Sequence, residues 1–117
     1  MAEICFNLAF SAMEKEIRHG LQPDNPALLD AYIAMADKLV EESNCQQQKI
    51  NILHRVADNL LEVICDTYLA EHWRHCCLDV IYKPMLALEQ LANCEGRRRQ
   101  VLRLQREVNC LGQYFFS

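Results

Sequence analysis

Glycine and threonine are scarce in this chain, and that scarcity limits its fold more than any other feature. The 117 residues include three glycines and a single threonine. Chains so poor in both residues seldom form many strands, so an all-α fold is predicted. The glycines also stand where helical patterns start or stop, at Gly20, Gly96 and Gly112.

The first two helices follow from apolar spacing and from the residues at their ends. A helix is expected from about residue 2 to 19, with an inward stripe at Phe6, Phe10, Met13 and Ile17. Gly20 should take a left-handed cap, with Leu21 folding back onto the helix. The second helix should begin with Asn25 as N-cap and Pro26 as its first residue.

A long third helix is expected next. A capping box formed by Ser43 with Gln46, or by Asn44 with Gln47, would start it. Its inward stripe should reach Tyr68, and the pattern leaves two alternatives, an unbroken helix to Tyr82 or a break near Asp66. Pro84 should kink or end the helix.

Two shorter helices complete the pattern. They are expected at Met85–Cys94 and at Arg97–Leu111, the second with a seam of Val101, Leu104, Val108 and Leu111. Gly112 should end the last helix and leave "QYFFS" as an aromatic tail. With 51% hydrophobic and 24% charged residues, the chain has the composition of one globular domain. We predict a single domain over residues 1–117, a compact bundle of about four to five helices with one long central helix.

The stretch "AEHWRHCCLDV" gathers two histidines and two adjacent cysteines. At 100° per residue, Trp73, Cys76 and Val80 share the core arc with Leu69. His72, His75 and Cys76 form the candidate ligand set of a metal or redox sensor. Ligands on one straight helix cannot converge on one ion, however, and no second His/Cys cluster completes the set. Adjacent cysteines on a helix point about 100° apart and do not readily bridge. Neither a metal nor any other cofactor is therefore expected, and no catalytic signature indicates an enzyme.

Basic residues are concentrated at the C-terminus. Residues 1–96 hold 7 Lys and Arg against 15 Asp and Glu, whereas residues 97–117 hold 5 Arg against one Glu. The basic face consists of Arg97, Arg98, Arg99, Arg103 and Arg106. It could track phosphates, and nucleic-acid binding is kept as an alternative, but the acidic body would repel nucleic acid. Pairing with the acidic body, with an acidic protein or with a second copy of the chain is favoured.

Large apolar residues exceed what a small bundle can bury, and such a surplus commonly marks an interface. The expected interaction residues are Ile4, Cys5, Leu8, Phe10, Tyr114, Phe115 and Phe116. Their alternative role is internal, with the first helix central and the tail tucked into the core. The interface interpretation predicts a homodimer.

The cysteines and the hydropathy of the chain indicate the cellular compartment of the protein. There are seven cysteines, an odd number, with no C-x-x-C pair, which indicates reduced thiols and a cytoplasmic protein. No apolar run approaches the roughly 18 residues of a membrane helix. The first residues contain Glu3 and no early Lys or Arg, which argues against a secretory signal.

The stretches "FNLAFSAMEKEI" and "LLDAYIAMADKLVEES", in a short acidic helical chain, resemble the small bacterial antiactivators of quorum-sensing transcription regulators, the QslA type. That resemblance implies a dimer that occupies the regulator's own dimerisation surface. Secretion chaperones and other small helical adaptors look similar at this level. The expected function is therefore a non-enzymatic interaction protein that masks an apolar surface of a protein partner such as a transcription regulator.

Overall fold

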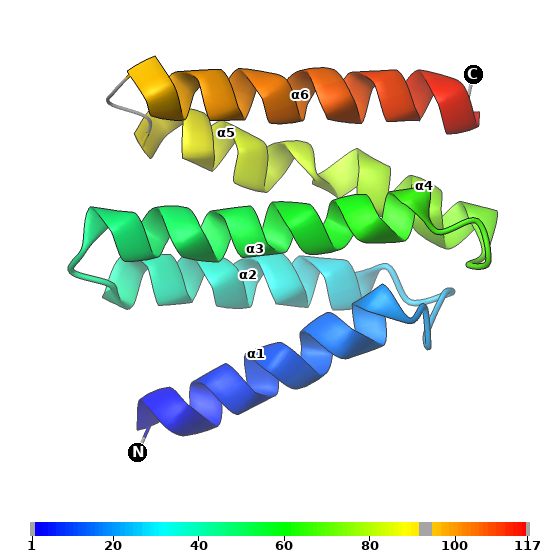
Figure 1. Ribbon diagram of the computed structural model, residues 1–117. Helices are drawn as coiled ribbons and strands as arrows, with labels where there is room; N and C mark the ends of the chain where they lie inside the picture. Colours follow the sequence, from blue (N-terminus) through cyan, green and yellow to red (C-terminus); the bar gives the residue numbers. More distant parts are fainter. Residues whose placement is uncertain (1, 92–94, 117) are drawn as a thin grey trace.

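The computed structural model describes the backbone of residues 2–91 and 95–116 and the side chains of residues 8–91 and 98–115. Within those ranges every regular element is an α-helix, which confirms the all-α bundle (Figure 1). The helices are α1 (Ala2–Arg18), α2 (Ala27–Glu42), α3 (Gln46–Cys65), α4 (Glu71–Val80), α5 (Tyr82–Leu91) and α6 (Glu95–Phe116).

Helix α3 is the central element and packs against α1, α2, α4, α5 and α6. Its buried apolar residues are Ile50, Leu53, Val56, Ala57, Leu60, Val63 and Ile64. Each large side chain among them stabilises the fold by about 1.5–3 kcal/mol relative to an exposed position. The helices are arranged as a slab of 39 × 36 × 17 Å, with α1 and α6 at opposite edges (Figure 1).

Gly20 ends α1 as predicted. Its φ is +59°, the left-handed conformation that glycine adopts without strain. The amide of Leu21 donates to the carbonyl of Glu16, and the amide of Gly20 donates to that of Ile17. These two bonds form a Schellman motif. The chain thus folds back at Leu21 through its backbone, while the Leu21 side chain is 66% exposed.

The third helix breaks near Asp66, which decides between the two alternatives left by the sequence. Asp66 follows the last residue of α3, and its carboxylate accepts a hydrogen bond from the amide of Tyr68. That turn directs Tyr68 into solvent, where it is 98% exposed, so its predicted inward position is wrong. A second interruption at Ile81 separates α4 from α5 and places Pro84 in the first turn of α5, where a proline is tolerated.

The buried face of α4 differs from the predicted one. Trp73, Cys77 and Ile81 are buried, whereas Cys76 is only half-buried. The prediction assumed that the buried stripe of α3 continues without interruption through residue 69. Because the helix breaks at Asp66, α4 starts at a different rotation about its helix axis. The core arc of α4 is therefore rotated by about 60° from the expected one.

The predicted helix ends at three other positions are also wrong. Pro26 and Cys45 occupy the N-cap positions of α2 and α3, and neither helix has a side-chain cap. The Asn25 side chain bonds Gln22 instead, and Ser43 bonds Gln48. Helix α6 continues through Gly112 to Phe116, and Gly112 packs beside Leu78, where a Cβ would make an ordinary van der Waals contact.

Candidate interaction surfaces

An apolar groove runs between α5 and α6. It consists of two successive hollows of about 580 and 410 Å³. On α6 the lining positions fall within about 140° of the helical circumference, so both hollows open on the same side of that helix. The groove is lined by Leu78, Ile81, Tyr82, Met85, Glu89, Gln90, Arg98, Val101, Leu102, Gln105, Val108, Asn109, Gly112 and Gln113.

Two large apolar side chains are exposed in this groove. Tyr82 is 56% exposed and lines the first hollow, and Leu102 is 52% exposed and lines the second. Leu86, one turn from Tyr82 on α5, is 51% exposed but lines neither hollow. Sequence reasoning missed these residues as a site. The sequence nevertheless held a signal, because Leu102 falls outside the seam of Val101, Leu104 and Val108, and Tyr82 precedes the helix expected at Met85–Cys94.

Of the interaction residues predicted on α1, one has a described side chain at the surface. Leu8 is 66% exposed. Phe10 is 2% exposed and stacks on Tyr32 with ring centroids 5.1 Å apart, so this predicted interaction residue belongs to the core. The side chains of Ile4 and Cys5 lie outside the described residues.

The aromatic tail is the last turn of α6. Tyr114 is 80% exposed, whereas Phe115 is half-buried with its ring 4.6 Å from the Arg74 guanidinium. Phe116 lies outside the described side chains. The beginning of α1 and the end of α6 are at opposite corners of the slab, so the α1 face and the aromatic tail are separate surfaces of one chain (Figure 1).

The basic face of α6 is exposed to solvent. Arg99, Arg103 and Arg106 are exposed and share an arc of about 60°. Arg98 lies on the other side of the helix, in the apolar groove. Arg97 lies outside the described side chains. Arg103 and Arg106 form no ion pair with any described residue.

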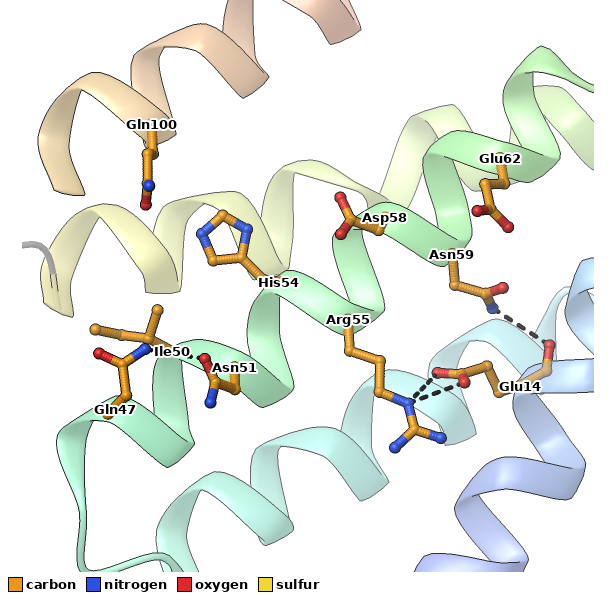
Figure 2. A pocket seen from close by; sticks show the side chains of 10 residues that line it. All are labelled: Glu14, Gln47, Ile50, Asn51, His54, Arg55, Asp58, Asn59, Glu62 and Gln100. Carbon is orange, nitrogen blue, oxygen red and sulfur yellow. Dashed lines mark hydrogen bonds and ion pairs between the residues drawn. The ribbon is translucent and has the colours of Figure 1, made fainter. Parts of the chain in front are cut away.

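A polar groove of about 630 Å³ lies over α3, on the side that faces solvent between α1 and α6 (Figure 2). Its lining residues are Glu14, Gln47, Ile50, Asn51, His54, Arg55, Asp58, Asn59, Glu62 and Gln100. Gln100 is the residue that α6 contributes, and it extends from that helix toward the groove (Figure 2).

A hydrogen-bond network joins α1, α2 and α3 at the α1 side of this polar groove. Arg55 Nε donates to both carboxylate oxygens of Glu14, at 3.0 and 3.1 Å, and the Tyr32 hydroxyl donates to Glu14 at 2.7 Å. The Asn59 amide donates to the Glu14 carbonyl at 3.3 Å. Burial, followed by the Glu14 carboxylate, raises the pKa of Tyr32 well above its ordinary value. The network holds the three helices together.

The candidate ligands in the His/Cys stretch have separate partners. His72 Nε2 lies 3.0 Å from Asp24, and His75 Nδ1 lies 3.3 Å from Asp79 on the next turn. Among the described residues, no three His, Cys, Asp or Glu side chains are placed to hold a metal ion.

Both thiols of the stretch are held in the protonated form. Burial, with a smaller contribution from Asp79, raises the pKa of Cys76. Burial raises the pKa of Cys77 to about 12. Since the thiolate is the nucleophile and the metal ligand, neither cysteine is activated for that chemistry at neutral pH.

None of the described helices combines the length and the apolar character needed to cross a membrane. Comparison of the chain with protein families, curated proteins and solved structures finds no match.

Proposed function

We propose that this protein is a non-enzymatic interaction protein, and that its apolar groove between α5 and α6 masks an apolar surface of a protein partner. The observation that carries the proposal is the exposure of Tyr82 and Leu102 in the groove between α5 and α6. Exposed apolar side chains gathered at one place on a small domain are characteristic of interaction sites.

The shape of the molecule supports a surface role. Its solvent-accessible surface is 7295 Å². A compact monomer of 13.6 kDa would expose about 6,600 Å², so this slab exposes about a tenth more. The additional surface is available for contact with another chain, and a stable interface covers about 800 Å² on each partner.

The lining of the groove indicates the kind of segment that it fits. A groove between two helices takes the apolar stripe of a third, amphipathic helix, whose anchors recur every three or four residues. Met85, Val101 and Val108 provide an apolar floor, while Glu89 and Arg98 stand at one end and Gln113 at the other. The partner segment should therefore be an amphipathic helix with polar residues at its ends.

The partner class that we propose is a transcription regulator, on the resemblance of the α1 and α2 stretches to antiactivators. Occupying a helix that the regulator uses for its own dimerisation would keep the regulator from pairing. A dimeric regulator binds two half-sites with matched spacing, so a monomer loses most of its affinity for the operator. Masking an apolar helix is enough for this mechanism, and no chemical step is required.

The test compares three leucines that are all exposed. Leu102→Arg introduces a charge into the apolar groove, Leu8→Arg changes the α1 face, and Leu21→Arg lies in the loop between α1 and α2 and serves as the matched control. Partners retained from a native lysate by the wild-type chain are identified by mass spectrometry, and the purified partner is then titrated against each variant.

Leu102→Arg should weaken binding about 30-fold or more, the effect of losing roughly 2 kcal/mol at a well-packed contact. Leu21→Arg should bind like the wild type, and all variants should keep helical circular dichroism. Loss of binding in Leu8→Arg alone would move the interface to α1. A partner that binds all three variants equally would contradict the groove proposal.

A further inference from the structure

The polar groove over α3 and the basic face of α6 are adjacent surfaces of opposite charge. Gln100 lines the polar groove and also borders the hollow formed by Arg99, Arg103 and Arg106. This one residue therefore marks the boundary between the two surfaces. Leu102 lines this hollow as well as the apolar groove between α5 and α6, so the basic face borders that groove. Asp58 and Arg103 line neither hollow of the apolar groove, so variants at these two residues test the pair of charged surfaces separately from the proposed function.

The polar groove carries an excess of carboxylates. Glu14 is paired with Arg55 at 3.0 Å. The Arg18 guanidinium serves two carboxylates, those of Glu62 at 3.2 Å and Asp66 at 2.8 Å. Asp58 is exposed in the middle of the groove and forms no ion pair with any described residue. Net negative charge therefore remains along the outward side of α3.

The basic face carries the opposite excess. Arg103 and Arg106 likewise form no ion pair with any described residue. Helix α6 packs against α3, α4 and α5 and forms one edge of the slab (Figure 1), and both of these side chains are exposed to solvent. A segment with the charge of the polar groove would complement them.

We infer that two copies of this chain associate about a two-fold axis, with the basic face of α6 in each copy lying along the polar groove over α3 in the other. Two-fold association is self-complementary, because each contact between surfaces of the two chains occurs twice. Adjacent surfaces of opposite charge satisfy that requirement, since one rotation pairs both surfaces at once.

A second copy fits the basic face better than nucleic acid does. The residues before Arg97 carry 15 Asp and Glu against 7 Lys and Arg, and that acidic body would repel a phosphate backbone. The same acidic body attracts the basic helix of another copy. The contact consists largely of exposed ion pairs, which salt screens, so the dimer should be weak and sensitive to ionic strength.

The experiment uses charge reversal in the purified full-length chain, with mass measured by light scattering at low salt. Arg103→Glu and Asp58→Lys should each shift the mean mass toward that of one 13.6 kDa chain. Mixing the two variants should restore a dimer, because the two reversed charges then face each other at one contact and the original residues pair at the other. Glu41→Lys, an equal change of charge on the exposed side of α2, is the control and should dimerise like the wild type.

The result that overturns the inference is a wild-type chain of 13.6 kDa at all concentrations in low salt, or a variant mixture that stays monomeric. Tight binding to duplex DNA that Arg103→Glu abolishes, without dimerisation, would assign the basic face to nucleic acid. Circular dichroism of each variant separates loss of association from loss of folding.

Discussion

Trp73 donates its indole N–H to the backbone carbonyl of Ile17 at 3.1 Å, across 56 residues of sequence. Both side chains are fully buried. The bond fixes α4 against the end of α1, where the Ile17 carbonyl also accepts the amide of Gly20. A Cβ at Gly20 would lie 3.4 Å from the indole and 3.2 Å from Leu69, so the turn, the indole and the loop before α4 pack as one unit.

Replacing Trp73 with phenylalanine should destabilise the fold by about 1–3 kcal/mol, because the hydrogen bond is lost and part of the indole volume is left empty. The loss stays within that range since the Ile17 carbonyl keeps its bond from Gly20. Urea denaturation followed by circular dichroism measures it. Tyr68→Phe, at a side chain that is 98% exposed, is the control and should leave the midpoint unchanged.

Arg74 stabilises the C-terminal end of α3. Its Nε and one terminal nitrogen donate to the Ile64 carbonyl at 3.0 and 2.8 Å, and the Phe115 ring covers the guanidinium. Lysine cannot reproduce this fork, so Arg74→Lys should lower the free energy of unfolding by about 1–3 kcal/mol. Phe115→Leu removes only the ring and should cost less. If both variants unfold at the wild-type urea midpoint, this interaction does not hold α3, α4 and α6 together.

The sequence pattern predicts the elements whose burial depends on local spacing. The core residues of α3 follow its 3.6-residue period, and Val101, Leu104 and Val108 are buried as their spacing predicts, whereas Leu111 at the end of the seam is only half-buried. Gly20 is recognisable because a left-handed helix end favours glycine.

Features that depend on distant contacts could not be predicted in this way. The core face of α4 depends on the turn at Asp66, which Arg18 and Arg74 stabilise from other helices. The exposure of Tyr82 and Leu86 likewise depends on where α6 packs on α5. The spacing of apolar residues within one helix does not specify that position.

The chain should purify without a stoichiometric metal. His72 and His75 are engaged with Asp24 and Asp79 in separate places, and burial keeps Cys76 protonated. Elemental analysis of protein prepared without chelator measures this. One zinc per chain, lost on His75→Ala but retained on His54→Ala, would contradict the prediction and support the sensor alternative.

Stability should fall steeply at alkaline pH because of Tyr32. Burial and the Glu14 carboxylate raise the pKa of this phenol above its ordinary value of 10.0, so the folded chain keeps a proton that the unfolded chain releases. The contribution of Tyr32 to stability is therefore complete below pH 10 and decreases as the pH rises further. Each such group lowers the free energy of unfolding by about 1.4 kcal/mol per pH unit.

Cys77 adds a second contribution that begins at lower pH. Its pKa rises from 9.0 to about 12, so its contribution declines between those values. Urea titrations at pH 8, 9, 10 and 11 under reducing conditions separate the two groups. Cys77→Ala should flatten the curve from pH 9, and Tyr32→Phe should flatten it only above pH 10. If Tyr32→Phe leaves the pH dependence of the free energy of unfolding unchanged above pH 10, the phenol is not held protonated by burial beside Glu14. The contacts joining α1, α2 and α3 would then be looser than their distances indicate.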